Sequence, residues 1–206
     1  MKRIIFLYLL FTFSFSQTGI ITHDGFFGFG IWANSIIPFK GESEKYYNFK
    51  TELYIPAGIE LSASAIKLEG QEMSYDAGIG YHYKFNNMGL QVKHTRREYN
   101  RSNSFTLSFD NDELYSEHID LTFYKTGKLN PFIKFSNTNI IGDHINKKKR
   151  LDAVSIGGMG RLTRLITLST SLMLPIYNDK FLIEHAWMEI SFGFELATYI
   201  AEIFNR

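Results

Sequence analysis

Ser116, His118 and Asp120 are the residues in this sequence whose types and spacing come nearest to a hydrolytic triad. A hydroxyl becomes a nucleophile when an imidazole lies within hydrogen-bond reach and a carboxylate orients that imidazole. Residues two apart on a strand share a face but lie about 6.5–7 Å apart, so direct contact depends on the rotamers. A Ser-x-His-x-Asp run also arises on any polar strand face. We therefore expect no enzyme, and we keep a lipid hydrolase as an alternative.

The histidines do not form a metal-binding motif. His23, His82, His94, His118, His144 and His185 lie on separate segments, and the chain has no cysteine. Neither HExxH nor HxH occurs, so two imidazoles are never placed on one face at ligand spacing. We expect neither a metal nor another cofactor.

Two glycine-rich stretches invite comparison with phosphate-binding loops. They contain Gly25, Gly28 and Gly30, and later Gly157, Gly158 and Gly160. A phosphate cradle needs a helix N-terminus directly after the loop, and strand patterns follow here instead. Glycines within strands more often mark bends or tight curvature. We interpret these glycines as structural.

Charge gives the chain no long-range attraction for a polyanion. Its 22 Lys and Arg residues balance 21 Asp and Glu residues, for a net charge of +1. Nucleic-acid binding depends on an excess of basic groups, so we do not expect it.

The dominant hydrophobic period in the chain is two residues, which is the period of a β-strand. From Ala186 to Leu196 apolar residues alternate with a second set that includes Glu189 and Glu195. The same alternation marks four earlier segments: 77–85, 104–109, 118–124 and 166–174. Weaker segments fill the gaps at 25–37, 47–55, 59–68, 89–96, 131–140 and 153–162. Turn-forming residues separate the segments, so the sequence predicts an all-β protein of successive antiparallel hairpins.

The first residues have the order of a secretory signal peptide. Lys2 and Arg3 precede an apolar run from Ile4 to Phe13, and small residues follow at Ser14 and Ser16. We predict a signal peptide at 1–16 and one β-barrel domain at 17–206. No later segment has the uninterrupted apolar length of a transmembrane helix.

Eleven strand segments are one too many or one too few for a closed barrel, because bacterial single-chain barrels have an even number of strands. Longer and shorter connections alternate as far as Lys125, and the alternation fails between Lys125 and Arg150. A turn at Asn137–Asn139 would give twelve strands, and merging two segments would give ten. We prefer twelve and allow ten.

Polar residues recur on one face of segment after segment, and several segments approach the length that a tilted strand needs to cross a bilayer. Together with the signal segment and aromatic residues near segment ends, this favours a membrane barrel with apolar side chains outside. The residues expected to face the lumen are Glu60, Lys84, Lys93, Asp120, Lys134, Glu189 and Glu195. The alternative is a soluble periplasmic or secreted barrel that binds a small apolar ligand inside.

By its signal segment, hairpin rhythm and final strand at 186–196, the chain resembles small bacterial outer-membrane β-barrel proteins. This resemblance implies an antiparallel up-and-down barrel in the cell outer membrane, reached by signal-peptide-dependent export. It implies a structural role or a narrow pore for small solutes, with outer-membrane lipid and the barrel-assembly machinery as partners. Members of that class usually end in an aromatic residue, whereas here Phe204 stands third from last.

The hydrolase alternative at Ser116, His118 and Asp120 would then be membrane-embedded. The basic run Lys147–Arg150 is interpreted as a solvated loop. Contact of that run with lipopolysaccharide phosphates or another anionic partner is the alternative.

Overall fold

The computed structural model describes residues 28–40, 46–55, 57–68, 73–98, 115–127, 129–141, 149–163, 165–177 and 180–196. The strands are β1 (Gly28–Pro38), β2 (Tyr46–Ile55), β3 (Ile59–Leu68), β4 (Ser74–Phe85), β5 (Met88–Glu98), β6 (Tyr115–Lys125), β7 (Leu129–Ile141), β8 (Lys149–Arg161), β9 (Ile166–Tyr177), β10 (Lys180–Phe181) and β11 (Trp187–Glu195). A single 3-10 turn, η1 (Ile183–His185), precedes β11.

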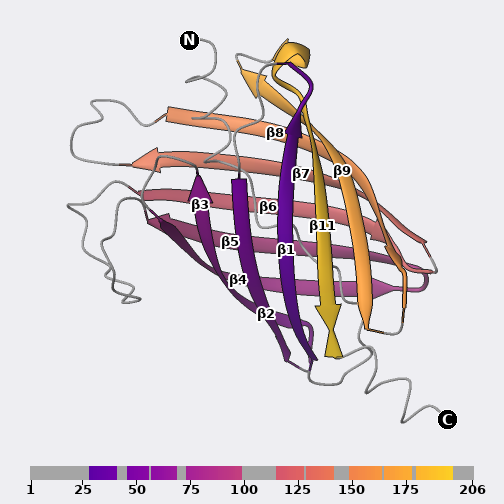
Figure 1. The fold of residues 1–206 in the computed structure, drawn as a ribbon. Coiled ribbons are helices and arrows are strands. Elements are labelled where there is room, and N and C mark those ends of the chain that lie inside the picture. The colour runs from indigo at the N-terminus through magenta and orange to yellow at the C-terminus, as the bar shows by residue number, and fades with distance from the viewer. Residues whose placement is uncertain are drawn as a thin grey trace, which may run out of the picture.

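The sheet closes on itself into a barrel. Each strand from β1 to β9 pairs antiparallel with the next, β11 pairs with β9, and β11 also pairs with β1. The closing register places Ile31 opposite Phe194 and Pro38 opposite Trp187. Figure 1 shows β11 lying between β1 and β9. The two-residue β10 only extends the edge of β9, so ten strands form the wall of the barrel.

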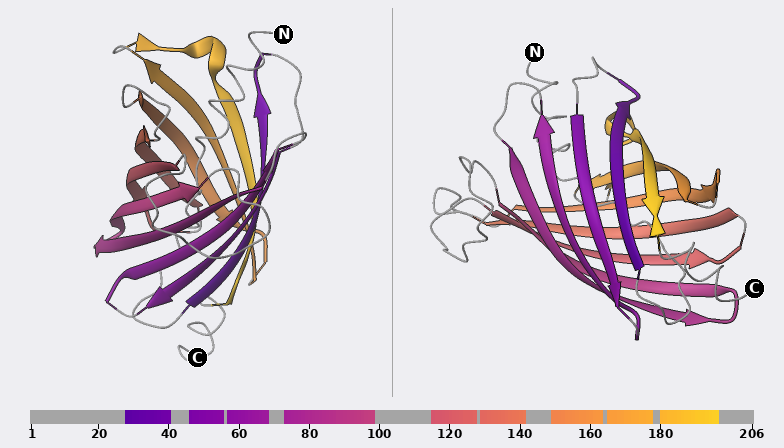
Figure 2. Two further views of the ribbon diagram at one scale, coloured as in Figure 1. Left: turned by 90° about the vertical axis from the view of Figure 1, so that its left-hand side faces the viewer. Right: turned by 60° about the horizontal axis from the view of Figure 1, so that its bottom comes forward.

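Strand length and turn chemistry explain this architecture. The wall strands run from 9 residues in β11 to 13 in β7 and β8, whereas strands of soluble proteins average about five or six. Asn86 opens the β4–β5 turn with φ at 54°, which asparagine tolerates better than most residues. Figure 2 shows from two directions that the strands form one continuous, strongly tilted wall.

The two faces of the wall have opposite chemistry. Along β1 the burial alternates strictly, with Trp32 and Asn34 buried and Ile31 exposed. Across the described strands most of the buried side chains are polar or charged, while the exposed large side chains are mainly Ile, Leu, Phe and Tyr. Polar residues thus line the inside and apolar residues cover the outside. A water-soluble barrel with an apolar interior would have the reverse arrangement.

The fold class expected from the sequence is confirmed as an all-β, antiparallel closed barrel. Its strand number is ten, the number that was allowed, rather than the preferred twelve. The turn expected at Asn137–Asn139 is wrong, because these residues lie inside the continuous strand β7 and pair with β6 and β8. The segment 104–109 lies outside the described residues, and β5 pairs directly with β6.

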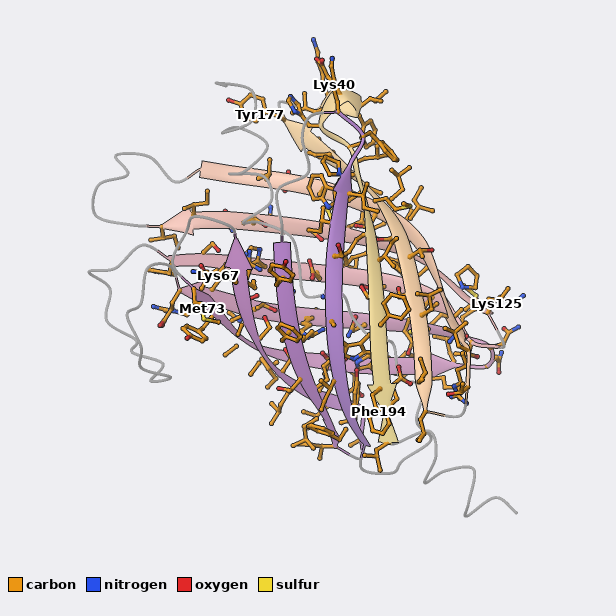
Figure 3. All side chains as sticks on the ribbon, in the orientation of Figure 1. Lys40, Lys67, Met73, Lys125, Tyr177 and Phe194 are labelled. Atoms are coloured by element: carbon orange, nitrogen blue, oxygen red, sulfur yellow. The ribbon has the colours of Figure 1, made fainter. Side chains whose placement is uncertain are left out.

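The two ends of the barrel differ in their connections. At one end, short connections follow β2, β4, β6 and β8, and β1 begins and β11 ends there. At the other end, longer connections follow β1, β3, β5, β7 and β9. We call these the short-turn end and the long-loop end. Figure 3 labels Lys40 and Tyr177 near the long-loop end and Phe194 near the short-turn end.

Among the described residues, no helix is long and apolar enough to cross a membrane. The predicted signal peptide at 1–16 lies outside the described residues, and so do His23 and His144.

Candidate functional site in the barrel lumen

A compact cluster of charges fills the lumen beside β2, β3 and β5. Lys50 and Glu52 stand two apart on β2 and pair with each other, and Lys93 of β5 pairs with Glu60 of β3. The ammonium nitrogen of Lys93 also lies 3.6 Å from Oε1 of Glu52. All four side chains are fully buried. Alternating signs let each charge compensate its neighbours where water cannot.

Glu60 and Lys93 meet although β4 runs between their strands. Both residues are register partners of Gly80, one from each side. A Cβ atom at Gly80 would lie 3.4 Å from Oε2 of Glu60. This is an ordinary van der Waals contact. The side chains of Glu60 and Lys93 therefore pass over Gly80 of β4 to form their ion pair.

Further polar side chains complete the shell of the two carboxylates. Gln91 donates its side-chain N–H to Oε2 of Glu60 at 2.6 Å, and Nε2 of His82 lies 2.6 Å from the same oxygen. Tyr54 donates its hydroxyl to Oε2 of Glu52 at 2.7 Å. Hydrogen bonds of this kind stabilise a buried carboxylate beyond its ion pair. The result is a connected polar network rather than isolated charges.

A second ion pair lies nearer the long-loop end. Arg97 of β5 donates Nε and Nη2 to the two oxygens of Asp76, at 2.7 and 2.8 Å. The two residues are direct cross-strand partners and are both buried. This fork-to-fork geometry fixes both side chains and ties β4 to β5 inside the lumen.

The triad residues predicted from the sequence are only partly brought together. Ser116 Oγ lies 2.8 Å from Nε2 of His118, so the hydroxyl–imidazole contact forms. Nδ1 of His118 lies 2.9 Å from the Thr138 hydroxyl, which takes the position of the orienting carboxylate. Asp120 is buried on the same face, and its Oδ1 has no hydrogen-bond partner among the described residues. Ser116 is 0% exposed, so a substrate has no access to its hydroxyl.

Two apolar layers divide the lumen. One consists of Trp32, Tyr124, Phe132 and Met159. The other contains Ile36, Ile66, Ala153, Met173 and Trp187. Three of the four residues in the first layer are aromatic, and we call it the aromatic layer. Along β1, Trp32 lies closer to the short-turn end than Ile36, so the aromatic layer is the one nearer that end.

Each ring of the aromatic layer rests on a glycine directly opposite on the next strand. Trp32 pairs in register with Gly193, Tyr124 with Gly89, and Phe132 with Gly157. A Cβ atom would lie 2.6 Å from a Trp32 ring carbon, 2.5 Å from a Tyr124 ring carbon and 2.6 Å from the Phe132 Cζ atom, respectively. A methyl group at any of these glycines therefore displaces a ring.

We expect Gly89→Ala and Gly193→Ala each to lower the free energy of unfolding by about 1–3 kcal/mol, because the added methyl overpacks the aromatic layer. Gly158→Ala is the matched control, since a Cβ atom there meets nothing within 4 Å. It should change the free energy of unfolding by less than about 0.5 kcal/mol. Urea titration of tryptophan fluorescence in detergent micelles measures all three. Equal effects at Gly89 and Gly158 would contradict the ring-on-glycine account.

The structure places the predicted lumen residues as follows. Six are buried, with 0–3% of their surface exposed: Glu60, Lys93, Asp120, Lys134, Glu189 and Glu195. Lys84 alternates in step with His82 and Gly80 on β4 but is exposed, because it stands beside the Asn86–Asn87 turn at the rim. The sequence argument missed Lys50, Glu52, Asp76 and Arg97. Alternation along β2 would have indicated the first two, since both share a face with Tyr54.

Among the described residues, no group of three or more His, Cys, Asp or Glu side chains is arranged to hold a metal ion. Long side chains of the described strands project into the lumen instead. Those of Lys50, Lys93 and Lys134 retain at most 1% of their surface exposed. Side chains lining an open, water-filled bore would retain far more.

Comparisons with known proteins identify neither a family nor a close relative. No protein-family model matches the chain, and no curated protein matches it. Among solved structures, it is similar to the N-terminal β-barrel domain of Pseudomonas aeruginosa OprF, with 14% identity, a TM-score of 0.38, and coverage of 84% of this chain and 100% of that one. It is also similar to the in-vitro folded trimer form of OmpT, a Vibrio cholerae outer membrane protein, with 6% identity, a TM-score of 0.26, and coverage of 85% and 100%.

These structures belong to the class that the sequence pattern resembles. Their TM-scores lie below 0.5, so any function must be inferred from the geometry of this chain alone.

Proposed function

We propose that this chain is a non-conducting β-barrel of a bacterial outer membrane, with a structural role, whose wall is embedded in lipid. The observation that supports this is the inverted distribution of side chains. Outward residues such as Ile79, Phe192 and Ile156 are each 54–55% exposed, whereas Lys50, Glu52 and Glu60 are buried inside. In water that exterior would be a large exposed apolar surface, which soluble monomers avoid. In lipid it is the expected exterior.

The packing of the lumen supports a structural role rather than a narrow pore. Barrels of about eight strands have interiors that side chains fill, and those of sixteen to eighteen hold an aqueous channel. Ten strands fall between these limits, so the size of the side chains inside the barrel determines whether a channel remains. Here the charge cluster, the Arg97–Asp76 pair and both apolar layers occupy the interior.

The hydrolase alternative has one supporting contact, the Ser116–His118 hydrogen bond. Its orienting partner is a hydroxyl, and the nucleophile is enclosed by the wall of the barrel. Catalysis by this pair would need both a carboxylate partner and access. We therefore propose that Ser116, His118 and Thr138 stabilise the interior by their hydrogen bonds.

Fractionation of cells that express the full chain tests the proposal. We expect the protein to remain in the membrane pellet after a carbonate wash and to migrate differently on gels before and after boiling. Reconstituted in planar bilayers, it should give no regular conductance steps. Extraction by carbonate would contradict membrane insertion. Regular conductance steps from inserted protein would contradict the non-conducting role and favour the narrow pore.

A further inference from the structure

The outer surface of the wall carries a polar strip on β5 to β8, near the long-loop end. On β5 the outward residues Leu90 and Val92 are followed toward the loops by His94 and Arg96. On β1, by contrast, Ser35 is the polar residue of the outward face, and the loop end is apolar, with Ile37 41% exposed and Phe39 just beyond it 61%. The apolar covering therefore stops earlier on β5 than on β1.

Strand register aligns the polar residues of four strands. His94 lies opposite Ile119, which lies opposite Asn137, which lies opposite Asp152. In the neighbouring row, the successive partners are Arg96, Glu117, Asn139 and Arg150. Seven of these eight residues are polar, and they form two adjacent rows across the outside of the barrel.

Contacts within the strip hold its side chains in place. Asn139 donates to Oδ1 of Asn137 at 3.1 Å, and Asn137 donates to Oδ1 of Asp152 at 2.5 Å. Arg150 donates to the same Asp152 oxygen at 3.1 Å. On β5 the guanidinium carbon of Arg96 lies 4.0 Å above the ring centre of Tyr115. The strip is thus an ordered surface of amides, carboxylates and guanidinium groups.

A molecule that covered both this strip and the wall beside it would have to be amphipathic. Toward the short turns, the same four strands present Val92, Phe123, Phe135 and Ile156, each between 38% and 54% exposed. A ligand lying along the wall would therefore contact apolar side chains toward the short-turn end and polar side chains at the strip. A lipid with its headgroup level with the strip satisfies both.

The chemistry of the strip selects among lipid headgroups. A phospholipid phosphate offers acceptors, which suit Arg96 and Arg150 but not Glu117 or Asp152. Sugar hydroxyls both donate and accept, so they also suit the carboxylates and the amide groups of Asn137 and Asn139. We propose that this strip binds a phosphorylated glycolipid of the outer leaflet, with the sugars on the amides and carboxylates and a phosphate near the two arginines. This inference rests on the proposed membrane function, which puts the long-loop end outside.

Native mass spectrometry of the full chain, refolded in detergent, tests this binding with two probes: purified lipopolysaccharide and phosphatidylglycerol. The variant is Asn137→Ala/Asn139→Ala/Arg150→Gln. We expect it to bind lipopolysaccharide about tenfold more weakly than the parent protein, through lost hydrogen bonds to the headgroup. The control is Lys67→Gln, on the exposed outer face at the loop end of β3, and it should bind as the parent does.

Each other result overturns the inference. Equal loss in the variant and the Lys67 control would show non-specific attraction. Equal binding of both probes by the parent protein would exclude selection of the sugar. Retention of a second copy of the chain in place of lipid would make the strip a dimer contact. If the triple variant does not show the folded gel mobility, Arg150→Gln alone replaces it, because that side chain is 69% exposed. A carbonate-resistant protein that binds no glycolipid refutes this inference and leaves the proposed function standing.

Discussion

Glu60→Gln should lower the free energy of unfolding by about 3–5 kcal/mol, because it leaves a buried ammonium group without its compensating charge. Glu60 accepts contacts from Lys93, His82 and Gln91 inside the barrel. The substitution preserves the shape of the side chain, so cavity formation does not contribute to the cost. Lys93 would keep only the longer, 3.6 Å approach to Glu52 among these carboxylates. Chemical denaturation of the protein in micelles, followed by tryptophan fluorescence, measures the effect.

A compensating second substitution distinguishes the loss of the ion pair from a general disruption of packing in the lumen. Glu60→Gln/Lys93→Met removes both charges and should recover most of the lost stability, since a matched apolar replacement of a buried pair is often close to neutral. The exposed pair Lys40–Glu184, with 64% and 67% of the side-chain surfaces accessible, is the control for a surface contact. Glu184→Gln should cost at most about 1 kcal/mol. A double variant as unstable as Glu60→Gln would show that the ion pair is not the source.

Ile79→Arg should destabilise the inserted barrel by about 2–4 kcal/mol, because it puts a charge in the hydrocarbon near the middle of a spanning strand. Ile79 is central in β4 and 55% exposed on the outer face. The matched control is Leu129→Arg, at the short-turn end of β7, where Leu129 is 74% exposed. There the charge reaches the interface, and the cost should fall to about 0–1 kcal/mol.

Refolding into phospholipid vesicles, with the folded fraction read from gel mobility across a urea series, measures both variants. The comparison also tests the solvent around the wall. For a water-soluble barrel, arginine at an exposed isoleucine would be neutral or would improve solubility. An Ile79→Arg barrel as stable as the Leu129→Arg barrel would therefore argue for water outside, and against the proposed function.

The number of strands could not be predicted from the local sequence pattern. Asn137, Thr138 and Asn139 have the composition of a turn, and this led to the preference for twelve strands. In the structure Thr138 faces inward to His118, while both asparagines face outward into the polar strip. Polar residues on the outside of a membrane strand do not follow the rule that apolar residues face outward. The pattern alone therefore could not distinguish this part of β7 from a turn.

In the lumen, likewise, the sequence predicted which face a residue occupies but not which residue it contacts. The sequence placed Glu60 and Lys93 on the inward face, and both are buried. It did not indicate that they pair, because they are 33 residues apart and stand on strands that do not adjoin. Their contact depends on the register of β3, β4 and β5. Likewise, Ser116 and His118 were expected to share a face, but Thr138 reaches His118 only through pairing of β6 with β7.

By itself, the sequence determined that the chain forms strands and which residues share each face, because successive side chains on a strand alternate by local backbone geometry. Only the tertiary structure decided the number of strands in the wall and which lumen charges pair. Those properties arise from hydrogen-bond register between strands distant in the chain and from closure of the sheet, where the inward side chains of all ten strands compete for one interior volume.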